Sequence, residues 1–375
     1  MSRIYLDHNA STPIDPKVAA AMRPYLEEAF GNPSSGHWAS LPAKDALERA
    51  RGKVAAMLGC RSDEIVFTSG GSEANNLALK GTFFAGPRDG AHIVTTAVEH
   101  PAILSPCRFL ERLGAAVTYL PVDGTGRVDP DDLRRAISSR TILVSVMHAN
   151  NEVGTIQPIE ALAQVARERG VPFHTDAAQS VGKIPAKVDD LGVDLLSVAG
   201  HKLYAPKGIG ALYVRRGVAL EPLIHGAGHE GGRRAGTESA LLAAALGEAC
   251  ALAADLSAMD GVRRLRDSFW GGLRERFGSR VVLNGDPEHR LPNTLNVAFP
   301  GVVGSELLGK LDGIAASTGS ACHAGRIELS PVLAAMGIAP EIGMGAIRFS
   351  LGRRTTAAEI GTVLERLTAA LVPAS

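Results

Sequence analysis

The chain of 375 residues lacks an excess of charge of either sign and lacks a long apolar run. Its 39 Lys and Arg residues equal its 39 Asp and Glu residues, so it has no net charge with which to attract nucleic acid or an anionic membrane. No stretch without charged residues reaches the roughly 18 apolar residues of a membrane-spanning helix. We therefore expect no direct nucleic-acid substrate and no membrane partner.

Cysteine is scarce as well. Cys60, Cys107, Cys250 and Cys322 are widely separated and form no CxxC pair, which fits neither a disulfide scaffold nor a zinc ribbon. We expect no metal site. The N-terminal residues MSRIYLDHNASTP reach Asp7 before any apolar run, so they do not resemble a secretory signal. These features lead us to expect a cytoplasmic protein.

Short apolar runs alternate with helical spacing through the first two thirds of the chain. The runs predict strands at 65–68, 92–96, 116–120, 141–147, 171–174, 193–198 and 210–214, the last two as a hairpin-like pair. Such alternation favours a mainly parallel sheet of an α/β fold. Beyond a long Ala-rich helix, strands near 281–283 and 294–298 and the segment GAIRFSLGR follow without regular alternation. We predict a large domain at 15–255 and a smaller α+β domain at 1–14 and 256–375.

A glycine turn joins the first predicted strand to a helix in the segment EIVFTSGGSEANNLALKG. Gly70 and Gly71 would let the backbone approach a ligand, Ser72 could cap the helix, and the first helical N–H groups would face a phosphate. The segment is neither GxGxxG nor GxxxxGK[ST], which disfavours nucleotide folds. A capped helix after a glycine turn explains these residues equally well.

An acid and a lysine follow two further predicted strands. Asp176 and Gln179 lie in VPFHTDAAQSVG, and Lys202 follows His201 in LLSVAGHKLYAPKG. Ligands of open α/β sheets bind at the carboxyl ends of strands, and a partly buried lysine can form a Schiff base with a carbonyl. Asp176 alone could be a helix cap and Lys202 a solvated loop residue. Together with the phosphate cup, they match the phosphate, ring nitrogen and aldehyde of pyridoxal 5′-phosphate.

The sequence resembles the cysteine desulfurases of the class V aminotransferase group along nearly its whole length. The motifs that carry the resemblance occur in family order: LDHNASTPIDP, TSGGSEANN, VEH, MHANNEVG, HTDAAQSVGK, GHKLYAPKGIGALYV, RAGTES, GSACHAG and IRFSLGR. The resemblance implies the fold-type I architecture of pyridoxal-phosphate enzymes, with a seven-stranded sheet in the large domain. It also implies removal of sulfur from L-cysteine, leaving L-alanine and an enzyme persulfide.

The resemblance assigns the cofactor residues one by one. Lys202 matches the lysine that holds the cofactor aldehyde, Asp176 the partner of the ring nitrogen, and Gln179 the donor to the phenolic oxygen. His100 matches the catalytic residue stacked on the ring. The remaining cofactor contacts that it implies are Gly71, Ser72, Asn151, His201 and Thr237. Thr237 would come from the other subunit, so the resemblance also implies a homodimer.

Substrate and sulfur contacts are implied in the same way. Arg348 matches the arginine that holds the substrate carboxylate, which also suits the two-pronged geometry of a guanidinium. Asn151 and Asn9 match substrate contacts, although Asn9 could equally stabilise a turn. Cys322 matches the persulfide-forming nucleophile, and its small, glycine-rich surroundings predict an exposed loop. Cys60, Cys107 and Cys250 lie in segments that read as structural.

Two departures leave alternatives open. Ala199 replaces a serine that often donates to the phosphate, and Ser72 replaces the usual threonine. The pair Cys322 and His323 is also similar to selenocysteine lyases, which would release selenide and L-alanine. A non-catalytic sulfur carrier would not need Lys202, and a Cys-dependent hydrolase would need neither Lys202 nor Asp176. A sulfur-acceptor protein is an expected partner, but the pathway served, iron–sulfur cluster assembly or another, stays open.

Overall fold

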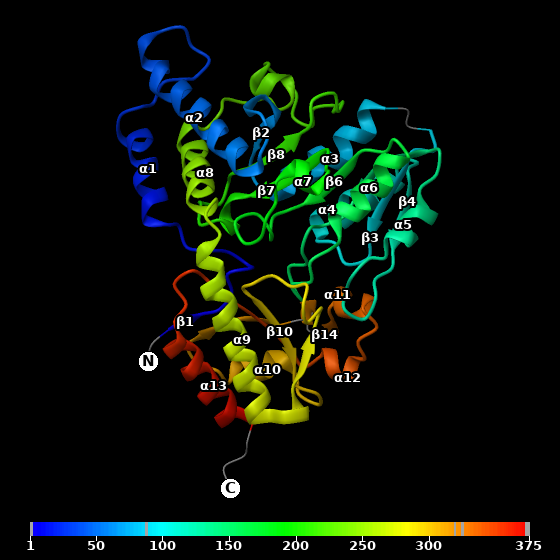
Figure 1. The fold of residues 1–375 in the computed structure, drawn as a ribbon. Coiled ribbons are helices and arrows are strands. Elements are labelled where there is room, and N and C mark those ends of the chain that lie inside the picture. The colour runs from blue at the N-terminus through cyan, green and yellow to red at the C-terminus, as the bar shows by residue number, and fades with distance from the viewer. Residues whose placement is uncertain (1–2, 87–88, 319, 324–325, 372–375) are drawn as a thin grey trace.

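The computed structural model describes residues 3–86, 89–318, 320–323 and 326–371, with only the backbone described for 320–323, 326 and 327. Its larger part is built around a seven-stranded sheet, and a smaller part with a four-stranded sheet lies beside it (Figure 1). Helix α8 (Ala240–Ala253) lies on the larger part, and α9 (Ser257–Phe277) continues from it along the smaller part.

The seven-stranded sheet confirms the predicted mainly parallel architecture. Its strands, in spatial order, are β2 (Ile65–Thr68), β8 (Gly210–Val214), β7 (Leu195–Ala199), β6 (Phe173–Asp176), β5 (Thr141–Ser145), β3 (His92–Thr96) and β4 (Ala116–Leu120). β8 runs antiparallel to both of its neighbours, and the other pairs are parallel. The predicted strand positions agree to within three residues at each end, and β7 and β8 are the expected antiparallel pair.

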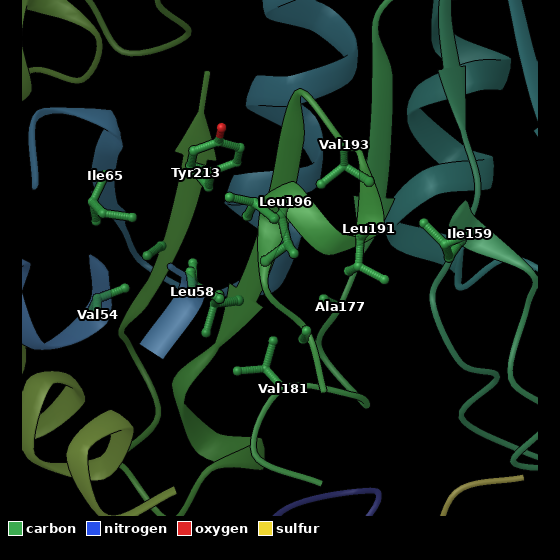
Figure 2. Packing of buried hydrophobic residues seen from close by; sticks show 14 of the residues in the cluster. Val54, Leu58, Ile65, Ile159, Ala177, Val181, Leu191, Val193, Leu196 and Tyr213 are labelled. Carbon is green, nitrogen blue, oxygen red and sulfur yellow. The ribbon is translucent and has the colours of Figure 1, made fainter. Parts of the chain in front are cut away.

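Alternate strand residues pack on opposite faces of this sheet, because successive side chains of a strand point in opposite directions. Ile65 and Phe67 belong to one core cluster, whereas Val66 between them belongs to another. The first cluster includes α2 (Leu41–Leu58) and α8, and the second includes α3 (Gly71–Ala85) and α4 (Pro101–Glu111). Figure 2 shows part of the first, with Leu58 of α2 near Leu196 and Tyr213 of the sheet. Burial on both faces explains why the strands are continuous apolar runs.

The remaining helices of this part are short or peripheral. They are α1 (Pro16–Glu27), α5 (Pro130–Ala136), α6 (Ile159–Glu168) and α7 (Val188–Leu191). α1 packs on α8, and α6 contributes apolar residues to the same cluster as α2. Asp15 caps α1 by accepting a hydrogen bond from the Lys17 backbone N–H at 2.9 Å.

The four-stranded sheet is antiparallel and contains β12 (Ser317–Thr318), β15 (Ala346–Ser350), β10 (Thr294–Ala298) and β9 (Val282–Asn284). A parallel pair, β1 (Ile4–Tyr5) with β11 (Ile314–Ala315), brings the N-terminus to it. Helices α9, α10 (Gly304–Gly309) and α13 (Ala357–Leu371) share its core, and α11 (Pro331–Ala335) and α12 (Pro340–Gly343) lie nearby. That core contains residues 4–6 and 259–367 and none from between.

The segment with Cys322 differs from its prediction. We expected an exposed loop, but the backbone forms a hairpin of β13 (Ser320–His323) and β14 (Arg326–Leu329), in which Cys322 pairs with Ile327. The Cys322 side chain lies outside the described part of the chain. The small residues that suggested a loop are therefore compatible with a two-stranded ladder, because its hydrogen bonds use the backbone.

Among the described residues, no single helix is long and apolar enough to cross a membrane. Helix α8 and the segment Ser257–Arg280 pass that test only as a pair, which is bent by 72°.

Candidate active site

A cavity of about 510 Å³ lies at the carboxyl ends of the parallel strands of the large sheet. His100 follows β3, Asp176 ends β6, and Lys202 follows β7, and all three line the cavity. Arg348 of β15 and Asn9 of the N-terminal segment line it from the smaller part. The sequence therefore predicted correctly that these strand ends meet, as expected for an α/β sheet.

The start of α3 forms one end of the cavity. Gly70 is the N-cap, with φ +148°, and no side chain caps the helix, so the expected capping by Ser72 is wrong. A Cβ on Gly71 would lie 3.1 Å from the Ala199 Cβ, which explains why a glycine stands where helix and strand approach. Within the described chain, no hydrogen bond uses the backbone N–H groups of Gly71, Ser72 or Glu73. These donors and the positive end of the helix dipole remain available to an anion.

Asp176 is the buried acid of the site, with a residue exposure of 6%. Its Oδ2 accepts a hydrogen bond from the Asn75 side-chain amide at 2.7 Å, and its Oδ1 accepts one from the Ala178 backbone N–H at 2.9 Å. No helix begins at Asp176, since the following residues form turns. The alternative of a helix cap is therefore wrong, and two neutral donors hold the carboxylate at the cavity wall.

Lys202 lies in a single 3-10 turn (Gly200–Lys202) directly after β7. Its Nζ donates hydrogen bonds to the backbone carbonyls of Asn9 and, at 2.8 Å, Ala10. Burial, with a smaller contribution from the Arg348 guanidinium, lowers the pKa of Lys202 to about 8. Roughly a tenth of Lys202 is therefore an uncharged amine at pH 7, far more than for an ordinary lysine, and a nucleophile or base requires that form. Lys207 lines the same cavity but is exposed to solvent.

His100 begins α4, and its Nδ1 accepts a hydrogen bond from the Ala102 backbone N–H at 3.0 Å. In the neutral ring the proton is therefore on Nε2. Burial lowers the pKa of His100, and the Lys202 charge adds to the effect. The uncharged His100 ring therefore lines the cavity, and its hydrogen bond to the start of α4 fixes its orientation.

Glu99, next to His100, was not singled out from the sequence. Its Oε1 accepts hydrogen bonds from the Met147 backbone N–H at 2.8 Å and the Thr96 hydroxyl at 2.9 Å. Its Oε2 is buried and has no partner among the described residues. Burial raises the pKa of Glu99 to about 8, and the Asp176 charge contributes. Glu99 is therefore a neutral acid behind the cavity at neutral pH.

Gln179 lines the cavity between two other polar groups. Its Nε2 donates to the Asn9 carbonyl at 2.9 Å, and its Oε1 accepts from the Lys183 Nζ at 2.8 Å. The sequence did not indicate a role for Lys183, since lysine is normally a surface residue. In the structure, however, Lys183 is only 9% exposed.

Arg348 is nearly buried in the middle of β15. Its guanidinium donates hydrogen bonds to Asp7 Oδ1 at 2.7 Å, the Ser317 hydroxyl at 2.9 Å and the Asn151 carbonyl at 2.9 Å. Its Nε is buried and has no partner among the described residues. The protein therefore fixes the guanidinium from one side and leaves a further donor unused.

Asn9 joins the two parts of the molecule. Its side-chain amide donates to the Asn151 carbonyl at 3.1 Å and to the Thr294 hydroxyl at 2.8 Å, and its Oδ1 accepts from Asn293 at 2.9 Å. The side-chain atoms of Asn9 are thus used by the protein. Because these partners are distant in the chain, the side chain of Asn9 joins the two parts and does not stabilise a local turn, and its contact with substrate stays a prediction.

The remaining predicted residues fall into two groups. Asn151 and His201 line the cavity, and burial lowers the pKa of His201 to about 4. Thr237 is exposed and does not line the cavity. Within the described chain, no group of three or more His, Cys, Asp or Glu residues could hold a metal ion.

The three cysteines with described side chains are poor nucleophiles. Burial raises the pKa of Cys60, Cys107 and Cys250 to about 12 in each case. They remain thiols at neutral pH, and only a thiolate attacks readily.

Known proteins of one family match this chain over nearly its whole length. Residues 4–363 match the family model for class-V aminotransferases. Cysteine desulfurase IscS of Dictyoglomus turgidum is 50% identical over 370 residues, covering 97% of this chain and 93% of that protein. Cysteine desulfurase IscS of Methanosarcina thermophila is 47% identical over 366 residues, covering 96% and 90%.

Solved structures give the same result. A NifS-like protein superposes with a TM-score of 0.91 at 38% identity and covers 98% of both chains. The structure described as SspA in complex with cysteine superposes with a TM-score of 0.85 at 38% identity, covering 94% of this chain and all of that one.

Proposed function

Since the chain belongs to the class-V aminotransferase family, we propose that it is a pyridoxal-phosphate-dependent cysteine desulfurase. It removes sulfur from L-cysteine and releases L-alanine, and Cys322 receives the sulfur as a persulfide. The observation that carries this proposal is the meeting of the uncapped α3 start, Asp176 and Lys202 in one cavity. The fold alone would not suffice, because one fold serves many reactions.

The residues present fit the cofactor. The free N–H groups of Gly71 and Ser72 suit its phosphate, with His201 beside them. Asp176 would hold the protonated ring nitrogen, and Lys202 would bind the aldehyde carbon. Ala199 offers no hydroxyl to the phosphate, so the backbone donors of α3 carry more of that interaction.

The remaining cavity residues have supporting roles in this proposal. Gln179 would donate to the phenolic oxygen, the His100 ring would cover the ring face, and Asn151 would contact both cofactor and substrate. Pyridoxal phosphate, when bound, supplies an electron-withdrawing ring that stabilises negative charge at the substrate Cα.

Lys202 is the base in this reaction, once the substrate amine has taken its place on the aldehyde carbon and freed its own amine. Its amine takes the proton from the substrate Cα and holds it for return to the product, and its pKa of about 8 suits both directions near neutral pH. The Asn9 and Ala10 carbonyls orient the amine. His100, as a neutral ring with its Nδ1 occupied, adds no positive charge of its own to the cavity.

Arg348 would hold the substrate carboxylate. Its guanidinium already pairs with Asp7, which fixes its position, and its unpartnered Nε provides a donor for the incoming carboxylate. A guanidinium binds a carboxylate through parallel hydrogen bonds. The substrate is thereby fixed relative to Lys202.

Cys322 completes the reaction. Its thiolate forms a bond with the substrate sulfur while the bond between Cβ and sulfur breaks. The electron pair of that bond stays with the carbon fragment, which takes up protons and leaves as L-alanine. The high pKa of the other three cysteines supports this assignment, because they lack thiolate at neutral pH.

We further propose that the protein is a homodimer in which Thr237 of each chain completes the neighbouring site. Thr237 is exposed and does not line the cavity of its own chain. The segment between α1 and α2 projects from the molecule (Figure 1) and exposes Phe30 by 85% and Trp38 by 80%. Such apolar residues suit a protein interface. Sedimentation equilibrium tests this, and a stable monomer would leave Thr237 without its role.

The domain division and the cellular setting belong to the same proposal. Residues 15–255 form the cofactor domain, and 1–14 with 256–375 form the small domain with Arg348 and Cys322. Separate core clusters for these parts support the division. A cytoplasmic protein acceptor takes the sulfur, and iron–sulfur cluster assembly is one pathway that could use it.

The experiment is turnover of the purified protein with L-cysteine and with L-selenocysteine, measuring alanine, sulfide and selenide. Near-zero turnover of cysteine with rapid selenide release would favour the selenocysteine lyase alternative. Cys322→Ala should still bind cofactor and cysteine but release almost no sulfide. Cys60→Ala is the matched control and should keep wild-type turnover.

Mass spectrometry after a short pulse of cysteine locates the sulfur. One added sulfur should appear on the peptide that contains Cys322. An added sulfur on Cys60, Cys107 or Cys250 instead would contradict the assignment of Cys322.

A further inference from the structure

Lys183 is a buried amine that the reaction proposed above does not use. It follows the turn after β6, is 9% exposed, and donates one hydrogen bond, to Gln179 Oε1 at 2.8 Å. No carboxylate pairs with it among the described residues. Burying an unpaired ammonium is unfavourable, so a lysine at this position needs an explanation beyond packing.

The charges around Lys183 are positive. Burial, together with the smaller effects of the Lys202 and Arg348 charges, lowers the pKa of Lys183 to about 7. Lys183 and Lys202 also line a second, small cavity of about 20 Å³ together with His8, whose Nδ1 is buried without a partner in the described chain. Lys183 therefore lies directly behind the wall on which Lys202 and Gln179 stand.

The partners of Gln179 determine which way its amide is oriented. The ammonium form of Lys183, roughly half of it at pH 7, can only donate to the amide oxygen, and the Asn9 carbonyl can only accept from the amide nitrogen. The oxygen is thus held on the side of Lys183. The second N–H of Gln179 is left for the cavity that this residue lines.

We propose that Lys183 is a positioning residue that holds the amide oxygen of Gln179, so that Gln179 offers only N–H groups to the cavity. This rests on the proposed function, in which Gln179 donates to the phenolic oxygen of the cofactor. Without Lys183, the amide oxygen would lose its partner and could turn toward the cavity, where two oxygens would repel each other. Lys183 therefore acts on the cofactor through Gln179.

A double-mutant cycle tests this inference. The dissociation constant of pyridoxal phosphate and the visible absorption maximum of the bound cofactor are measured for wild type, Lys183→Met, Gln179→Ala and the double variant. Lys183→Met should weaken cofactor binding by about tenfold, the loss of one buried hydrogen bond. The double variant should bind no more than about twofold more weakly than Gln179→Ala, because coupled residues are not additive.

Two further variants make the result specific. Lys187→Met makes the same substitution at an exposed position four residues away, and it should leave the dissociation constant and the spectrum unchanged. Lys183→Gln keeps an N–H donor without the charge, and it should restore most of the affinity lost in Lys183→Met. The free energy of unfolding of the cofactor-free variants, from urea denaturation, separates a folding defect from a loss of cofactor affinity.

Additive losses in the cycle, or an unchanged spectrum in Lys183→Met, would overturn the inference. If Lys183→Met does not fold, failure of Lys183→Gln to match the wild-type absorption maximum overturns it instead. Failure of the proposed function is a separate result, because wild-type protein would then bind cofactor without releasing sulfide from cysteine.

Discussion

The two sheets contribute to the cavity in different ways. The large parallel sheet supplies Asp176 and Lys202 from strand ends, where turns allow side chains to converge. The small antiparallel sheet supplies Arg348 from the middle of β15, within a ladder that pairs it with Asn296. In the proposed reaction, the strand ends carry the groups that react, whereas the strand interior carries a rigid group that binds the substrate.

This difference has a physical basis. A residue after a strand end has backbone groups that the sheet does not use, so Lys202 can sit in a tight turn with its amine oriented by the carbonyls of residues 9 and 10. A residue within a strand has its backbone fixed on both sides, so the long side chain of Arg348 is directed by the ladder and by Asp7. In the proposed reaction, the reactivity of Lys202 depends on its place in a turn after a strand end. The position of the substrate depends on Arg348, which is fixed within a strand.

The largest expected effect comes from the strand-end lysine. Lys202→Ala should lower turnover of cysteine to background and remove the borohydride-reducible linkage to the cofactor, because burial lowers the pKa of Lys202 to about 8, whereas Lys207, the other described lysine that lines the cavity, is exposed. Mass spectrometry after borohydride treatment is the measurement. Lys187→Ala, at an exposed site, serves as the control. A reducible linkage that persists in Lys202→Ala would assign the role to another lysine.

A smaller effect is expected from the arginine within the strand. Arg348→Lys should raise KM for cysteine by about tenfold, because a charge-assisted, two-pronged interaction becomes a single point charge. The dissociation constant of the cofactor should not change. Steady-state kinetics and a cofactor titration measure the two quantities. If KM stays at the wild-type value, another basic residue binds the carboxylate, and the comparison between the sheets fails.

The smallest effect on turnover is expected behind the large sheet, where the change appears in stability instead. The pKa of Glu99 is raised to about 8 in the folded protein from an ordinary value of 4.5, so its stabilising contribution is complete below pH 4.5 and is lost as the pH rises toward 8. Glu99→Gln removes this titration while keeping an uncharged side chain. Relative to wild type, the variant should gain about 1 kcal/mol in free energy of unfolding per pH unit between pH 5 and 8.

Urea denaturation of both proteins across this pH range is the measurement. Glu365→Gln, at an exposed position of α13, is the control and should show no such trend with pH. A stability difference that is independent of pH would mean that Glu99 is ionised in the folded protein. It would also mean that the site contains a second buried negative charge beside Asp176.

The sequence predicted the large sheet and its site residues more closely than the site residue of the small sheet. The strands of the large sheet were predicted closely, because burial on both faces requires continuous apolar runs that stand out from amphipathic helices. Asp176 and Lys202 could be placed at the site from local sequence, since each directly follows such a run. Arg348 could not, because an arginine in a short antiparallel strand has no distinguishing neighbours, and only family resemblance indicated it.

The sequence by itself determined the parallel sheet, the strand-end residues and, through its motifs, the family. Only the tertiary structure decided that the side chain of Asn9 joins the two parts, that Glu99 is uncharged, and that Lys183 lies behind Gln179. These properties depend on burial and on partners distant in the chain. A local pattern records which residues tend to be buried, but it does not record which polar groups meet once they are.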